Sequence, residues 1–145
     1  GERSRNQGCH RLLRYLSTYS GQTYNGLILH PDNEHIIYPL GSTVVVRHIL
    51  SRTQTFLRGH DNKISGNCSS HLAIQVSRDG KYIASAQKSH PGFPADVLVW
   101  DFESKEIKHR LKLHKHGVTS LSFSPCSTML ASQSCLEDKY NLFLF

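Results

Sequence analysis

Residues 58–101 read RGHDNKISGNCSSHLAIQVSRDGKYIASAQKSHPGFPADVLVWD. The stretch opens on the Gly-His pair Gly59-His60 and closes on the Trp-Asp pair Trp100-Asp101. Between the pairs, short apolar runs such as AIQV and DVLVW are separated by segments rich in Gly, Pro, Asp and Ser, which favour turns. The pattern predicts one unit of several short strands, with a Gly-His pair at its start and a Trp-Asp pair near its end.

The unit recurs along the chain with a period of 47 residues. Its markers are three turn-like pairs that each follow a short alternating run, namely His30-Pro31, Ser77-Arg78 and Ser124-Pro125. Six residues after the start of each turn stands an apolar residue with the same period, namely Ile36, Ile83 and Leu130. An internal period of about 40–50 residues is typical of propellers built from repeated blades.

Each unit is expected to contain four strands. A third run, rich in β-branched or aromatic residues, closes each unit as TVVVRHI (43–49), DVLVWDF (96–102) and NLFLF (141–145). The segments TQTFLRGH (53–60) and EIKHRLKLH (106–114) suggest a fourth strand leading into the next unit. The expected fold is all-β, with about three four-stranded antiparallel blades of a WD40-type β-propeller. It would be incomplete and open, because a closed ring takes about four to eight blades.

The spacing also predicts how the chain is divided. Blades are expected at approximately 19–58, 59–112 and 113–145, after a basic N-terminal segment, 1–18, that includes the start of an outer strand. Within residues 11–22, RLLRYLSTYSGQ, the apolar residues also stand near helical spacing, so an amphipathic helix is the alternative to that strand.

Two departures from a regular repeat stand out. From His60 to Ser77 there are 17 steps, against 10 from His114 to Ser124, so about seven residues around Gly66–Leu72 look inserted beside the innermost strand of the second blade. Only about three blades are present, and the last run ends at Phe145. The expectation is that the chain is a fragment or a truncated form of a longer protein.

Polar residues at fixed places in the units predict an internal hydrogen-bond network. In a WD-type blade, a His before the inner strand, a Ser or Thr on the second strand and the Trp of the third strand bond to one another. The candidates are His60, Ser85 and Trp100, with Asp101 completing the Trp-Asp pair, and in the third unit His114 and Ser132. Their expected role is structural.

Several uncommon strings carry a resemblance to a known family. HPDNEHIIYPLG (30–41) and GFPADVLVWDF (92–102) closely resemble the N-terminal blades of the cilia- and flagella-associated protein 52 family, WD-repeat proteins of motile cilia. The resemblance runs over most of residues 19–132. It implies a non-catalytic structural or scaffold protein of the axoneme that binds tubulin and other axonemal proteins inside doublet microtubules. The implied location is the cytoplasm and cytoskeleton, within the cilium or flagellum.

A second class of function is a WD-repeat adaptor in a soluble multiprotein complex, such as a ubiquitin-ligase substrate receptor or an RNA-processing scaffold. The formal net charge of +6 and the sequence pI of about 9.3 suit an acidic partner in either class. Residues 117–136 carry no charge, but six serines and a proline make them a poor membrane span. Protein partners are expected, with no membrane and no nucleic acid.

Catalytic, cofactor and metal functions find little support in the motifs. Cys68 with His71, or His114 with His116, could supply a ligand pair, but no second pair stands at a convincing zinc spacing. The four cysteines form no CxxC pair, and the sequence has no GxGxxG, P-loop or HExxH motif. We therefore expect no enzyme activity, no cofactor, no metal and no small-molecule substrate.

Overall fold

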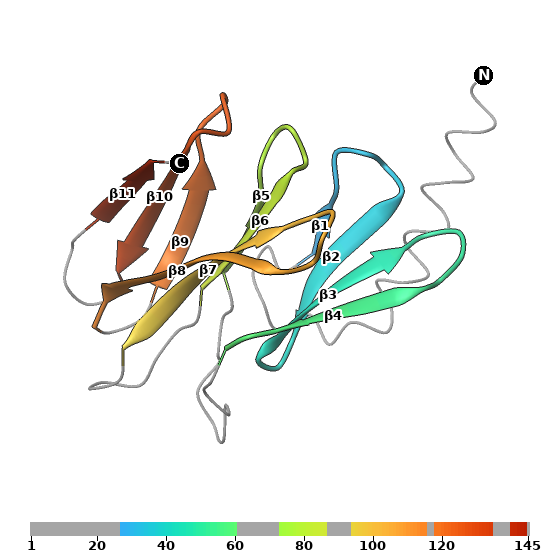
Figure 1. Ribbon diagram of the computed structural model, residues 1–145, viewed down its shortest axis with the longest axis horizontal. Coiled ribbons are helices and arrows are strands. Elements are labelled where there is room, and N and C mark those ends of the chain that lie inside the picture. The colour runs from blue at the N-terminus through green and yellow to red at the C-terminus, as the bar shows by residue number, and fades with distance from the viewer. Residues whose placement is uncertain (1–26, 61–72, 87–93, 116–117, 135–139, 145) are drawn as a thin grey trace.

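The structure is a computed structural model of the chain. It describes residues 27–60, 73–86, 94–115, 118–134 and 140–144, all as strands and their connecting turns. These strands form three antiparallel sheets that follow one another side by side (Figure 1). Within the described ranges there is no helix, and hence none that could cross a membrane.

The first sheet is a four-stranded meander of β1 (Ile28–Leu29), β2 (His35–Leu40), β3 (Thr43–His48) and β4 (Gln54–Arg58). Its third strand contains three consecutive valines, all buried, as expected where both faces of a strand are covered. A tight turn joins β2 to β3, and Gly41 takes the positive φ of 62° that this turn requires.

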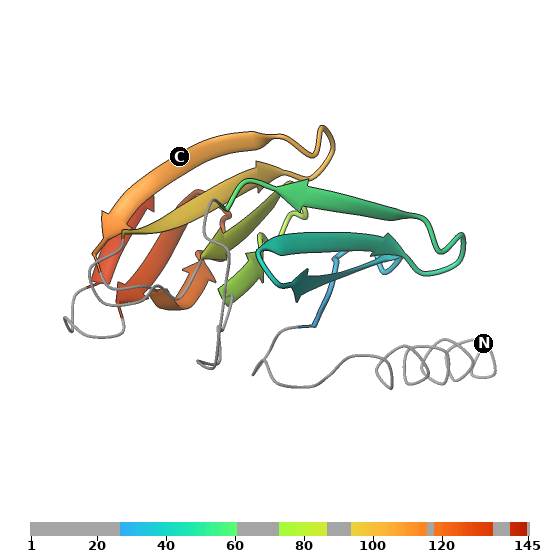
Figure 2. The same cartoon turned by 90° about the horizontal axis from the view of Figure 1, so that it is seen from below.

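The second and third sheets repeat the same meander. The second contains β5 (Ala73–Val76), β6 (Tyr82–Ala86), β7 (Ala95–Asp101) and β8 (Ile107–His114). The third contains β9 (Val118–Phe123), β10 (Met129–Ser134) and β11 (Tyr140–Leu144). The prediction of antiparallel blades in an open propeller is confirmed, and the sheets fan out without closing into a ring (Figure 2).

The 47-residue repeat is visible in the backbone of the first turn of each sheet. In each turn, a backbone N–H donates to the carbonyl oxygen of the residue three positions earlier. The bonds run from Asn33 to His30, from Gly80 to Ser77 and from Ser127 to Ser124, each at 2.9 Å. The residues that donate these bonds all have positive φ, of 60°, 76° and 60°. Asparagine and glycine tolerate this region better than serine does. The same turn is therefore built three times.

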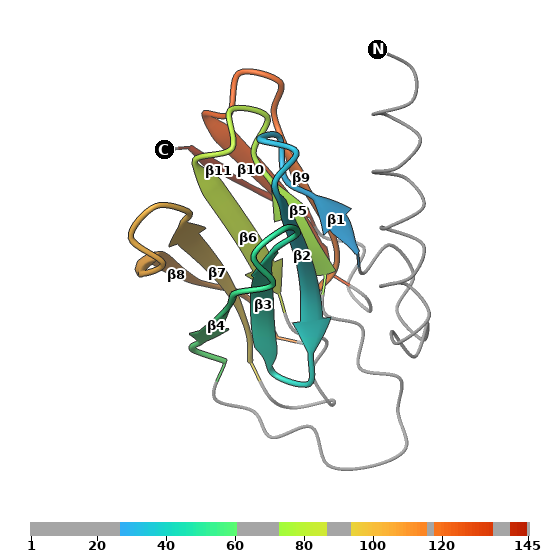
Figure 3. The same cartoon turned by 90° about the vertical axis from the view of Figure 1, so that its right-hand side faces the viewer.

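Two apolar clusters join the sheets face to face. The middle sheet sends alternate side chains to its two neighbours, because successive residues of a strand point to opposite faces. The cluster toward the first sheet contains Ile37, Val44, Val46, Leu57, Ile74, Ile83, Leu98 and Trp100. The cluster toward the third sheet contains Ala84, Ala86, Ala95, Val97, Val99, Val118, Leu121 and Leu130. The side view in Figure 3 shows the stacked sheets.

Three expectations from the sequence lie outside the described residues. These are the helix or strand at residues 11–22, the apparent insertion at Gly66–Leu72, and the final residue Phe145. The Cys68–His71 pair and His116, considered as metal ligands, also lie there.

Candidate functional site

The middle sheet holds a buried chain of polar side chains. Ser85 on β6 lies at its centre, with its Oγ 2.8 Å from His60 Nε2 and 2.8 Å from Trp100 Nε1. All three residues are buried, with exposed fractions of 0% for Ser85, 8% for His60 and 2% for Trp100. They come from the segment after β4, from β6 and from β7, so the hydrogen bonds tie together parts of the chain up to 40 residues apart.

The donor and acceptor roles follow from the chemistry of the three groups. The Trp100 indole N–H can only donate, so the Ser85 oxygen accepts from it. The Ser85 hydroxyl also bonds the ring nitrogen of His60. A serine beside a histidine is the pairing of a catalytic nucleophile. Ser85, however, is fully buried and its oxygen already accepts the indole proton, so no substrate can reach it.

Gly59 explains why a glycine precedes the histidine. A Cβ at this position would lie 2.7 Å from Ile107 Cδ1, 2.8 Å from Trp100 Cη2 and 3.2 Å from Leu98 Cδ1. The backbone here packs directly on the indole of Trp100. The Gly-His and Trp-Asp pairs that end the opening stretch are therefore in contact in the folded chain.

Gly59→Ala is expected to destabilise the fold by about 1–3 kcal/mol, the usual cost of adding a methyl group to a packed core. The side chains of Ile107 and Trp100 would both have to move. A urea denaturation curve followed by circular dichroism measures the change. Gly41→Ala is the comparison, because no atom lies within 4 Å of a Cβ there, so its cost would come from its positive φ alone. An unchanged midpoint for Gly59→Ala would contradict the close contact.

The third sheet repeats half of the network. His114 Nε2 lies 2.8 Å from Ser132 Oγ, and both residues are buried. Asp101 lies apart from these bonds. Its Oδ1 accepts the backbone N–H groups of Glu103 and Ser104 at 2.9 Å, which caps the turn between β7 and β8. The bond from Ser104 is the main reason that the pKa of Asp101 is lowered from its ordinary value.

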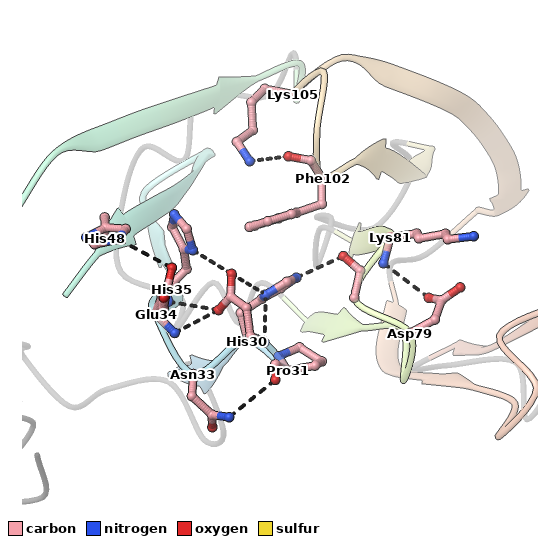
Figure 4. A network of polar contacts seen from close by, with 12 residues as sticks. His30, Pro31, Asn33, Glu34, His35, His48, Asp79, Lys81, Phe102 and Lys105 are labelled. Carbon is pink, nitrogen blue, oxygen red and sulfur yellow. Dashed lines mark hydrogen bonds and ion pairs between the residues drawn. The ribbon is translucent and has the colours of Figure 1, made fainter. Parts of the chain in front are cut away.

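The first sheet has a different polar site, which the sequence analysis did not single out. Tyr38 stands where Ser85 stands in the middle sheet, and its hydroxyl accepts a bond from Gln54 Nε2 at 3.2 Å. The turn between β1 and β2 instead gathers His30, Asp32 and His35. Figure 4 shows His30 and His35 in this turn. The signal was present in the string HPDNEH, where four possible ligands, including His30, Asp32 and His35, surround one tight turn.

His30 connects the first sheet to the middle one. Its Nε2 lies 2.8 Å from the carbonyl oxygen of Gly80, and its ring stacks on Phe102 at 3.7 Å between centroids and 14° between planes. This contact requires a glycine at position 80, because a Cβ there would lie only 2.9 Å from Cε1 of the His30 ring. Between the middle and third sheets, the Asp79 backbone N–H donates to Ser127 Oγ at 3.3 Å. The repeated turns thus contact one another in sequence.

Comparison with known proteins agrees with this geometry. The family described as WD domain, G-beta repeat matches residues 105–140, which include β8, β9 and β10. The chain therefore contains a WD repeat. Over 126 residues it is 44% identical to cilia- and flagella-associated protein 52 of Mus musculus, covering 87% of this chain and 19% of the relative. The Chlamydomonas reinhardtii protein of the same name is 46% identical over 128 residues, covering 88% and 20%.

A more distant relative is WD repeat-containing protein 90 of Mus musculus, 28% identical over 134 residues, which are 92% of this WD-repeat chain and 7% of that protein. The resemblance predicted from the strings HPDNEHIIYPLG and GFPADVLVWDF is confirmed. The chain spans about a fifth of the length of the cilia- and flagella-associated relatives that it matches.

Proposed function

We propose that this WD-repeat chain is part of a non-catalytic scaffold of the ciliary or flagellar axoneme, where its blades bind tubulin and neighbouring axonemal proteins. The observation that carries the proposal is the 44–46% identity to cilia- and flagella-associated protein 52 over nearly nine-tenths of the chain. WD-repeat propellers serve as platforms for other proteins, with contacts made by loops and rims that the rigid sheets position.

The use of the polar residues supports a non-catalytic role. The two Ser-His pairs, His60–Ser85 and His114–Ser132, have side chains suited to catalysis, but both pairs are buried, with the serine and histidine of each bonded to one another. They stabilise the blades in a place that a substrate cannot enter.

The charge of the chain favours an acidic partner. The outer strand of the middle sheet, β8, carries exposed cations, Lys108, Arg110 and Lys112, and Lys115 follows it. Arg110 is paired with Asp96 at 2.8 Å, whereas Lys108 Nζ donates to the Tyr82 hydroxyl at 2.8 Å. Among the described residues, the three lysines form no ion pair, so their charges are available to a partner. With a net charge of +6 for the chain, this strand suits the acidic surface of tubulin.

The proposal predicts that a tagged protein carrying this chain stays with axonemes after they are washed with salt. Replacing Lys108 and Lys112 together by Glu is expected to raise the released fraction, because the attraction to an acidic surface becomes repulsion. Fractionation of demembranated cilia and immunoblotting measure it. The matched control is Arg52→Glu, which reverses an exposed cation in the turn between β3 and β4 of the first sheet. Quantitative release of the parent protein into the soluble cytoplasm would instead support an adaptor of a soluble complex.

A further inference from the structure

The turn between β1 and β2 fixes the protonation of His30. Its Nε2 faces the carbonyl oxygen of Gly80 at 2.8 Å, and a carbonyl can only accept, so Nε2 carries a proton. Its Nδ1 accepts the backbone N–H of Asp32 at 3.3 Å. A neutral His30 therefore presents the lone pair of Nδ1 toward the interior of the turn. A histidine that binds a metal has this arrangement, with its other ring N–H donated to a backbone carbonyl.

The carboxylate of Asp32 has one oxygen engaged in the turn and one directed at the histidines. Oδ1 accepts the backbone N–H groups of Glu34 at 2.8 Å and His35 at 3.1 Å. Oδ2 lies 3.0 Å from His30 Nδ1 and 2.7 Å from His35 Nδ1. His35 Nδ1 can donate its proton to Oδ2 at 2.7 Å, so that contact is an ordinary hydrogen bond. The Nδ1 of a neutral His30 instead presents its lone pair to the same oxygen, and a cation between these two atoms removes that repulsion.

We propose that His30 Nδ1, Asp32 Oδ2 and His35 Nδ1 bind a divalent transition-metal ion of the Zn²⁺ class. The three atoms lie within 4.8 Å of one another. Ligand atoms on one tetrahedral zinc are about 3.3 Å apart, given bonds of about 2.0–2.1 Å, so small outward rotations of the rings and the carboxylate fit the ion. Two neutral imidazoles and one carboxylate leave a net charge of −1, and imidazole nitrogen suits Zn²⁺, Ni²⁺ and Cu²⁺.

The surroundings allow an ion to enter and hold the ligands in place. His30 is buried against Phe102, while Asp32 and His35 reach the solvent, so the fourth position of a tetrahedral ion faces water. A neighbouring cation is Lys105, whose Nζ lies over the Phe102 ring and donates to the Phe102 carbonyl (Figure 4). Its charge works against a metal at the site but is held on the far side of that ring.

The two equivalent turns show that this ligand set belongs to the first blade alone. At the places of His30, Asp32 and His35, one repeat later, stand Ser77, Asp79 and Tyr82. There the serine hydroxyl donates to Asp79 Oδ1 at 2.6 Å and accepts the Tyr82 backbone N–H at 2.9 Å, so the turn is complete without an ion. In the third repeat the places are taken by Ser124, Cys126 and Met129. The turn itself needs neither histidine.

The test is calorimetric titration of the 145-residue chain with Zn²⁺ above the pKa of histidine, repeated with Co²⁺ as a probe whose visible absorption reports tetrahedral ligands. One ion per chain is expected. Asp32→Asn keeps an oxygen for the turn amides, and His35→Tyr installs the residue of the middle blade. Each is expected to weaken binding by about 100-fold, since loss of even an outer partner costs about 10–100-fold. The matched control Asp79→Asn is expected to bind as the parent does.

Circular dichroism of each variant, and the rise in melting temperature that Zn²⁺ produces, separate loss of the site from loss of the fold. A variant that keeps the parent spectrum but loses the zinc-dependent rise supports the site. The proposal is overturned if the parent takes up no ion, or if Asp32→Asn and His35→Tyr both bind as tightly as Asp79→Asn does. In the second case the ligands would be histidines elsewhere in the chain. In both cases the contacts of Asp32 Oδ2 would be hydrogen bonds from protons on His30 Nδ1 and His35 Nδ1.

Discussion

Trp100→Ala is expected to lower the free energy of unfolding by about 3–5 kcal/mol, the usual cost of truncating a buried aromatic side chain. Trp100 is 2% exposed and belongs to the cluster that joins the first and middle sheets. Its removal leaves a cavity against Leu98 and Gly59 and takes away the indole bond to Ser85. A small domain is stable by only about 5–15 kcal/mol, so much of the chain would be unfolded or aggregated.

The measurement is a thermal melt and a urea curve followed by circular dichroism, because Trp100 is the single tryptophan and its fluorescence disappears with it. Trp100→Phe is the matched control. It keeps most of the apolar volume but has no N–H, so its expected cost is about 1–3 kcal/mol. If Trp100→Ala melts at the same temperature as the parent, the indole does not hold the two sheets together.

Ser85→Ala is the second large effect, with an expected loss of about 2–4 kcal/mol. The change removes one oxygen, but that oxygen bonds both Trp100 Nε1 and His60 Nε2. Both nitrogens would remain buried without the partner that they have in the native chain. A buried polar group left unsatisfied costs about 1–3 kcal/mol, far more than the loss of one exposed hydrogen bond.

Ser132→Ala is the internal control for this second prediction. Within the described part of the chain, Ser132 bonds His114 and no tryptophan, so about half the effect of Ser85→Ala is expected. Urea curves of the two variants should show lower midpoints at an unchanged slope, which identifies a change in stability alone. Equal effects of the two substitutions, or none from Ser85→Ala, would contradict the assignment of two bonds to Ser85.

Much of the fold could be predicted from local pattern. The alternation of apolar residues and the 47-residue spacing of the turns predicted the strands of all three sheets, because strand formation and turn type depend on neighbouring residues. The buried apolar residues Ile36, Ile83 and Leu130 also kept that period. His60, Ser85 and Trp100 could be selected by their places in the repeat, and the structure brings their polar atoms to 2.8 Å.

The turn at His30 could not be predicted in the same way. Known zinc motifs place their ligands in pairs at fixed spacings, and Asp32 with two histidines around a tight turn follows none of these spacings. The backbone N–H of Asn33, at positive φ, closes the turn on His30, which brings Nδ1 of His35 to 2.7 Å from the Asp32 carboxylate. The distance between these two side chains depends on the backbone conformation of the turn, and the residue types in the sequence predict that conformation only weakly.

The sequence by itself determined that this chain is a series of WD-type blades, because periodicity, turn residues and strand composition act over short distances and were each repeated. Only the tertiary structure decided which residues meet between blades. His30 bonds Gly80, 50 positions away, and stacks on Phe102, and Gly59 packs on Trp100. Such contacts depend on how one sheet is rotated and shifted against the next. That arrangement results from the packing of whole apolar faces, so no local pattern records it.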